Sequence, residues 1–141
     1  MDQFLEFIRN HPYHFVALGA GVLALIANEL HGTLTGGKRL SVSEAVRLIN
    51  DREPVILDVR TPADFKRGHL LNAQNAPLAK LDEHLTRVAK DKSRPVLVYC
   101  AIGSSSTGAV ERLRKSGYTE VYPLRGGIGA WVSANLPVTT K

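Results

Sequence analysis

The residues of this 141-residue chain with the clearest chemical potential lie in one stretch, VLVYCAIGSSS, at residues 96–106. An apolar run ends in Cys100, the only cysteine, and a loop of small residues leads to a helical pattern that begins near Thr107. A thiol between loop amides and a helix N-terminus lies where a thiolate is stabilised. Cys100 is therefore the candidate nucleophile, and the alternative for a bare cysteine is a small buried hydrophobic residue.

The composition is that of a globular protein with a basic surplus. The chain is 44% hydrophobic and 22% charged, and its net charge is +5. All but one of its Lys and Arg residues follow residue 37, which suits small anionic substrates, anionic lipid or nucleic acid. Nucleic acid ranks last because the sequence has no nucleic-acid motif and no aromatic stacking platform. A single cysteine excludes an internal disulfide framework, and we expect no metal and no cofactor.

An apolar segment near the N-terminus predicts a membrane anchor. Residues 15–27 contain no polar side chain, and the 18 residues from 13 to 30 would form about 27 Å of helix. We therefore expect a transmembrane helix at residues 13–30, after a short N-terminal segment at residues 1–12. A linker rich in Gly and Thr follows at residues 31–38.

A cleaved signal peptide is the competing interpretation of this segment. Asp2 and Glu6 outweigh Arg9 before the apolar run, and a cleavage site after Ala27 would place the bulky Leu25 at the minus-three position. We therefore favour an uncleaved anchor. Lys and Arg are more frequent after the segment than before it, which predicts a single-pass protein of the inner (cell) membrane. Its N-terminus would lie outside and its globular part in the cytoplasm.

The remaining chain, residues 39–139, predicts one α/β domain with a mostly parallel sheet flanked by helices. A capping box at Ser41 and Glu44 predicts the first helix, and Thr61 followed by Pro62 predicts the start of another. Further helices are expected near residues 79–89, 106–116 and 126–131, and strands near residues 55–59, 95–99 and 121–124. Cys100 lies at the carboxyl end of a predicted strand, where α/β sheets bind ligands.

The order of short motifs in this domain resembles that of the rhodanese homology family. The matching pieces are LDVR at 57–60, DF at 64–65, GHL at 68–70, NAP at 75–77, YCAIG at 99–103, LRGG at 124–127 and AW at 130–131. The resemblance covers residues 40–137. An N-terminal anchor followed by one such domain is similar to the membrane-anchored, single-domain rhodanese-like proteins of bacteria.

This resemblance implies a sulfurtransferase. Cys100 would take a sulfane sulfur from a small anionic donor such as thiosulfate, become a persulfide, and pass the sulfur to cyanide or to the thiol of a small molecule or protein. The backbone amides of Ala101, Ile102, Gly103, Ser104 and Ser105 would bind the donor, helped by the following helix N-terminus. One of the loop serines, at residues 104–106, is expected to cap that helix.

The loop departs from the family pattern in one respect. Many active members carry an arginine near the position of Ser105, whereas this loop has no Arg or Lys. Some small single-domain members resemble this sequence in having serine there. Arg125, just before Gly126 and Gly127, is the candidate for the missing positive charge. Asp58 and Arg60 are expected to form a structural network at the end of a strand.

Two other functions stay open at this stage. Phosphatase chemistry needs an arginine at position 106, which is Ser106, so it is disfavoured. A catalytically weak or inactive rhodanese-like module that docks a partner at the membrane is the main alternative, and the missing arginine is its best support. The sequence also leaves open a weak homodimer.

Overall fold

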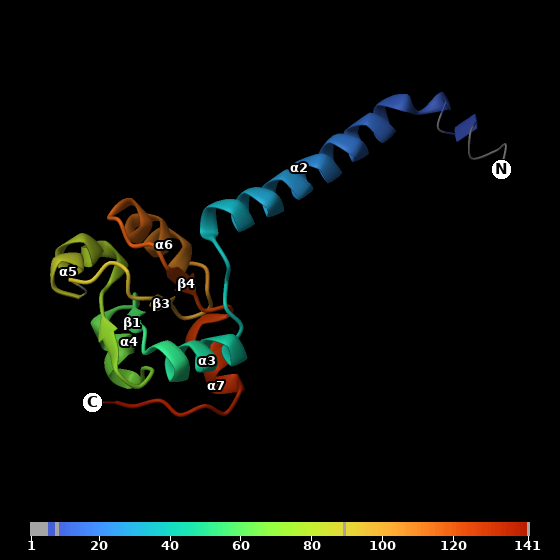
Figure 1. Cartoon of the computed structure of the whole chain (residues 1–141). Coiled ribbons are helices and arrows are strands. Elements are labelled where there is room, and N and C mark those ends of the chain that lie inside the picture. Colours follow the sequence, from blue (N-terminus) through green and yellow to red (C-terminus); the bar gives the residue numbers. More distant parts are fainter. Residues whose placement is uncertain (1–5, 8, 89, 141) are drawn as a thin grey trace. The chain divides into compact units, whose positions relative to one another are not determined.

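The computed structural model describes residues 6, 7, 9–88 and 90–140 (Figure 1). Contacts within the chain divide it into two compact units, Met1–Thr35 and Gly36–Lys141. Half of the predicted N-terminal segment, residues 1–5 and 8, lies outside the described residues.

The first unit contains all but the last residue of the helix α2, Pro12–Gly36. Pro12 opens it at a position where the missing backbone N–H is not needed. Side chains from residue 13 to residue 28 are exposed, apart from a half-buried Phe15. The segment that was expected to be helical, residues 13–30, is therefore helical in the structure.

The predicted membrane crossing of this helix is not supported. None of the helices in the described part of the chain has the length and apolar character that a transmembrane segment requires. The uninterrupted apolar run, residues 15–27, provides only about 20 Å of helix, whereas a hydrocarbon core is about 30 Å thick.

The segment predicted as a linker, residues 31–38, is helical in its first part, because α2 continues to Gly36. The division between the two units falls within this segment. No proline interrupts the helix after Pro12, so its backbone hydrogen bonds extend through the Gly/Thr-rich stretch. Gly37 follows with φ of 68°, in the left-handed region that glycine adopts readily at helix ends. The connection to the second unit is therefore short.

The second unit is built on a four-stranded sheet in the order β2-β1-β3-β4, with every neighbouring pair parallel. The strands are β1 (Val55–Asp58), β2 (Ala73–Asn75), β3 (Val96–Tyr99) and β4 (Val121–Pro123). The predicted α/β fold with a parallel sheet is thus confirmed. The sequence did not predict β2, because its three residues, Ala-Gln-Asn, have low strand propensity and lie at the sheet edge.

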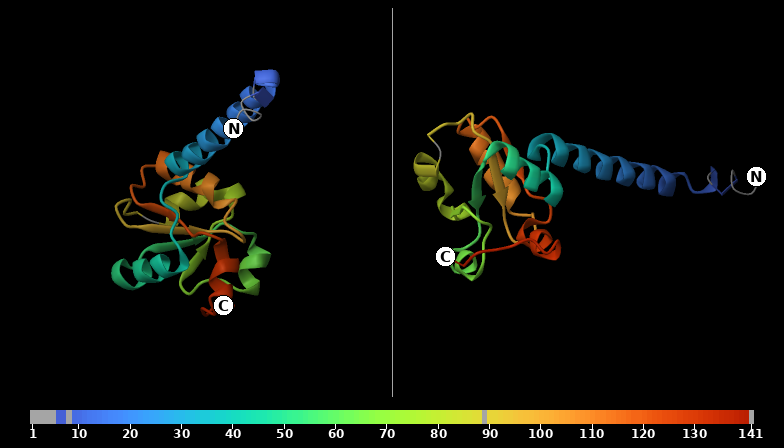
Figure 2. Two further views of the ribbon diagram at one scale, coloured as in Figure 1. Left: turned by 90° about the vertical axis from the view of Figure 1, so that its right-hand side faces the viewer. Right: turned by 60° about the horizontal axis from the view of Figure 1, so that its bottom comes forward.

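Helices cover both faces of the sheet (Figure 2). One core joins Ala45 and Trp131 to Ile56, Leu97 and Tyr99, and the other joins helical leucines and valines to the alternate strand residues. The helices are α3 (Val42–Arg52), α4 (Pro62–Arg67), α5 (Leu81–Val88), α6 (Ser106–Lys115) and α7 (Gly127–Ser133), with a short 3-10 helix η1 at Leu78–Lys80. The first core belongs to α3 and α7, and the second to α5 and α6.

Two predicted helix starts are confirmed. The Ser41 hydroxyl accepts a hydrogen bond from the Glu44 amide, and the Ser41 amide donates to the Glu44 carboxylate at 2.9 Å, which completes the capping box of α3. The Thr61 hydroxyl accepts a hydrogen bond from the Asp64 amide and so caps α4, with Pro62 as the first helical residue. Local sequence is enough to place these helix starts because each cap satisfies amides within its own first turn.

Candidate active site

Cys100 directly follows β3 at the edge of the sheet where the parallel strands end, and it is 3% exposed. The loop of residues 101–105 turns back over it, and the Gly103 amide donates a hydrogen bond to the Cys100 Sγ at 2.9 Å. Gly103 has φ of 93°, a conformation that other residues rarely adopt. The turn at Gly103 thus brings a backbone amide into hydrogen-bond contact with the Cys100 sulfur.

A loop serine was expected to cap α6, but no side-chain capping hydrogen bond is present at its N-terminus. Ser105 occupies the cap position but its side chain makes no capping hydrogen bond. The Ser106 hydroxyl instead donates back to the Gly103 carbonyl at 3.0 Å, and Ser106 is buried. This bond closes the loop on itself, because it joins the start of α6 to the residue whose amide contacts the sulfur.

The N-terminus of α7 holds the other end of the loop. The Ile128 amide donates to the Cys100 carbonyl at 2.9 Å, and the Gly129 amide donates to the Ala101 carbonyl at 3.1 Å. A Cβ atom on Gly127 would lie 2.3 Å from the Cys100 carbonyl oxygen, so only glycine permits this approach. These two hydrogen bonds satisfy the carbonyls of Cys100 and Ala101 and tie the start of the loop to α7.

The structure brings the predicted loop residues together around Cys100 but leaves their binding roles as predictions. Ala101, Ile102, Ser104 and Ser105 are exposed, whereas Gly103 is buried. The exposed residues line the outer side of the loop, where an incoming molecule would meet them.

Arg125 is exposed, and its amide donates to the Leu40 carbonyl at 2.8 Å. Among the described residues, no hydrogen bond or ion pair joins its side chain to the loop. No ion pair within the described part of the chain joins Arg125 to a carboxylate, and its predicted role in donor binding stays a prediction.

The end of β1 carries a buried ion pair beside this loop. Asp58 is fully buried, and it accepts hydrogen bonds from the Arg60 amide at 2.9 Å and from Arg60 Nη2 at 2.6 Å. Burial opposes the charged form of Arg60, but the hydrogen bonds from its guanidinium to Asp58 prevail and raise its pKa. Arg60 also donates to the Gly68 carbonyl at 2.6 Å, so the pair is a structural network, as expected.

Two functional features were missed in the sequence. Gly127 was noted only as part of a motif and Gly129 was not singled out, although their repetition is the signal for a close backbone approach. Arg39 was not named as a candidate, yet its guanidinium lies 3.4 Å from the Thr107 hydroxyl in the first turn of α6. It therefore adds a positive charge near the loop from outside it.

Within the residues that the structure describes, no group of three or more His, Cys, Asp or Glu side chains could hold a metal ion. The chemistry of the site as described rests on one sulfur, backbone amides and nearby arginines.

Comparison with known proteins identifies the fold. A family model described as a rhodanese-like domain matches residues 41–134, which is most of the chain. The chain belongs to the rhodanese-like domain family. Its globular part is 40% identical, over 94 residues, to thiosulfate sulfurtransferase GlpE of Coxiella burnetii. The aligned segment covers 67% of this chain and 86% of that protein.

Other relatives of this rhodanese-like protein extend the match. An uncharacterised Escherichia coli protein, YibN, is 27% identical over 98% of this chain and 97% of its own length, so the likeness includes the N-terminal unit. A rhodanese-related protein of Thermoplasma volcanium has a TM-score of 0.66 and 28% identity over 74% of this chain and its own full length. A Pseudomonas aeruginosa thiosulfate sulfurtransferase has a TM-score of 0.69 and 26% identity, covering 79% of this chain and 22% of that chain.

Proposed function

We propose that this protein is a sulfurtransferase that carries sulfur as a persulfide on Cys100. The observation that supports this most directly is the 2.9 Å hydrogen bond from the Gly103 amide to the Cys100 sulfur, inside a loop held at both ends. Such an amide stabilises negative charge on the sulfur in both the thiolate and the persulfide. The family membership and relatives named thiosulfate sulfurtransferase support the same reaction.

The reaction has two displacement steps. The Cys100 thiolate attacks the sulfane sulfur of thiosulfate, the S–S bond of the donor breaks, and sulfite leaves. An acceptor, cyanide or a thiolate, then attacks the outer sulfur of the persulfide, and Cys100 leaves as a thiolate. No external oxidant or reductant is needed, because each step breaks one bond to sulfur and forms another.

Intact mass spectrometry of the full chain after incubation with thiosulfate tests the first step. The expected result is a gain of one sulfur atom that cyanide removes with formation of thiocyanate, and Cys100→Ser should abolish both. Ser106→Thr keeps the hydroxyl that closes the loop. It serves as the matched variant and should retain both the gain of sulfur and the formation of thiocyanate. A wild-type protein that gains no sulfur and forms no thiocyanate would refute the proposal.

A docking module that uses the rhodanese fold without catalysis remains the second candidate, because the loop itself carries no cation. The phenotypes of two variants, measured in cells that depend on this protein, distinguish catalysis from docking. A phenotype that persists in Cys100→Ser but disappears when residues 1–31 are deleted would favour docking over catalysis.

We also propose that α2 associates with a lipid membrane. Val16, Leu23 and Leu25 are each at least 68% exposed, and a helix that is apolar on all sides is normally covered by protein or lipid. Co-flotation of the full chain with phospholipid vesicles tests this, with Leu23→Glu and Leu25→Glu together as the disrupting change. Full-length protein that stays with the soluble fraction would refute it. The cytoplasmic location of the globular domain stays a prediction.

A further inference from the structure

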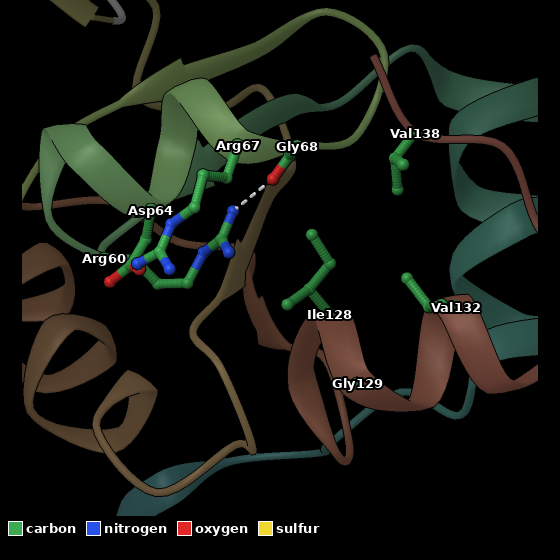
Figure 3. A pocket seen from close by; sticks show the side chains of 8 residues that line it. All are labelled: Arg60, Asp64, Arg67, Gly68, Ile128, Gly129, Val132 and Val138. Atoms are coloured by element: carbon green, nitrogen blue, oxygen red, sulfur yellow. Dashed lines mark hydrogen bonds and ion pairs between the residues drawn. The ribbon is translucent and has the colours of Figure 1, made fainter. Parts of the chain in front are cut away.

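A pocket of about 480 Å³ lies between α4, α7 and the C-terminal tail, and Figure 3 shows the side chains around it. The guanidinium groups of Arg60 and Arg67 form one wall together with Asp64. The opposite wall is apolar and consists of Ile128, Val132 and Val138. The pocket therefore offers charge on one side and a hydrocarbon surface on the other.

This pocket shares a wall with the Cys100 loop. Ile128 and Gly129 line the pocket, and the same two residues donate their amides to the carbonyls of Cys100 and Ala101. A molecule bound in the pocket would thus lie directly beside the backbone that positions the reactive sulfur.

The C-terminal tail is held in place to form part of the pocket. His69 and Thr139 exchange two backbone hydrogen bonds of 2.8 Å, and the Trp131 indole donates to the Pro137 carbonyl at 3.0 Å. Between these anchors, Val138 remains 43% exposed. Residues 135–140, which contribute this part of the wall, lie beyond the segment that matches the family model.

The charged wall suits a carboxylate. Arg60 is already oriented by Asp58 and the Gly68 carbonyl, whereas Arg67 is 77% exposed and its ion pair is with Asp64 on the same turn of helix. Guanidinium groups bind carboxylates through paired N–H donors. The volume is in the range of small-molecule sites and far larger than thiosulfate, which also has no apolar part to place on the valines.

We propose that this pocket binds a carboxylate-bearing thiol that accepts sulfur from Cys100. This inference rests on the proposed sulfurtransferase function. The acceptor thiolate attacks the outer sulfur of the persulfide, the S–S bond breaks, and its electron pair returns to Cys100 as the thiolate leaving group. The acceptor departs as a persulfide, and no net oxidation occurs.

Steady-state kinetics of the full chain with thiosulfate as donor test the pocket through two acceptors. Glutathione carries two carboxylates, and glutathione diethyl ester has the same thiol with both carboxylates masked. Arg67→Gln should raise KM for glutathione about fivefold relative to the ester, the size of an exposed ion pair. Asp64→Asn removes a competing carboxylate and should lower the same ratio, whereas Lys66→Gln, outside the pocket on the same helix, should not change it.

The apolar wall has its own variant, because Val138→Asp puts a carboxylate opposite the arginines and should also raise KM for glutathione more than for the ester. Equal changes for the two acceptors in Arg67→Gln and Val138→Asp would overturn the proposal.

Binding can be measured without catalysis by titrating S-methylglutathione, which cannot accept sulfur, and following the methyl NMR signals of Val132 and Val138. Shifts of these signals support the pocket even if the protein forms no thiocyanate, an outcome that would refute only the proposed function. Unchanged signals at millimolar ligand would overturn the pocket itself.

Discussion

Two neighbouring strands, β1 and β3, end side by side, but a negative charge at each end is stabilised by a different kind of group. At the end of β1, the negative charge of the fully buried Asp58 is neutralised by the side chain of Arg60. After β3, Cys100 lies in a loop without any charged side chain, and a backbone amide is the group that contacts its sulfur.

The difference shows where this fold can place a reactive group. The Arg60 guanidinium donates hydrogen bonds to Asp58 and to the Gly68 carbonyl. The main contribution of this charge pair is therefore structural. The sulfur of Cys100 depends on amides whose positions are set by contacts with α6 and α7. Changes to the Asp58–Arg60 pair should therefore lower the stability of the fold. Changes to the contacts that hold the Cys100 loop should instead displace its amides and lower activity.

The largest effect on activity is expected from Gly127→Ala. Its Cβ would lie 2.3 Å from the Cys100 carbonyl oxygen, and φ is 60°, so the loop must move. We expect thiocyanate formation to fall about 100-fold, the cost of a displacement near 1 Å at a reacting group. Gly108→Ala is the matched control, since its Cβ meets only Leu78 methyl groups at 4.0 Å and should stabilise α6 by about 0.5–1 kcal/mol. Full activity of Gly127→Ala would mean that the backbone clamp is dispensable.

Asp58→Ala should have the largest effect on stability. It leaves Arg60 without its buried partner, and the loss of one member of a buried ion pair costs about 3–5 kcal/mol. Glu111→Ala breaks an exposed pair with Lys115, which water screens, and should lower the free energy of unfolding far less. Urea unfolding of both variants measures the contrast, and similar losses would remove the distinction between a structural and a surface charge.

Arg125→Gln tests whether the neutral loop receives charge from outside. We expect KM for thiosulfate to rise about two- to fivefold with little change in kcat, because exposed charge interactions are worth about 0.2–1 kcal/mol. The effect should shrink with added salt. Arg47→Gln, an exposed cation on α3, provides the control. Equal KM values in all three proteins would leave donor binding to the backbone and to residues other than Arg125.

The smallest effect concerns Glu44, a charge whose partners are local. Hydrogen bonds from the Ser41 backbone and then from Lys38 lower its pKa to about 2, from an ordinary value of 4.5. Because the folded pKa is the lower one, the capping box stabilises the domain above pH 4.5 and loses that contribution as the pH falls towards 2. Glu44→Gln should melt below the wild type at pH 7, with the gap closing across this acidic range. A gap independent of pH would contradict this assignment.

Much of the fold could be predicted because it rests on local patterns. The strands β1 and β3 are short apolar runs, and the starts of α3 and α4 are encoded by caps within one turn. The strand β2 could not be predicted because parallel pairing with β1, rather than its own composition, makes it a strand. The helical state of the Gly/Thr-rich segment could not be predicted, because helix propagation from the apolar run outweighs the low helix propensity of Gly and Thr.

By itself, the sequence determined that a lone cysteine ends a buried strand and precedes a loop of small residues, since both features are local and compositional. Only the tertiary structure decided how that loop is held: Ser106 bonds back to Gly103, and the first turn of α7 takes the carbonyls of Cys100 and Ala101. It also decided that the tail near Val138 completes a pocket beside the loop. The contacts of α7 and of the tail join residues far apart in the chain, and they exist only after the strands have paired and brought their carboxyl ends to one edge.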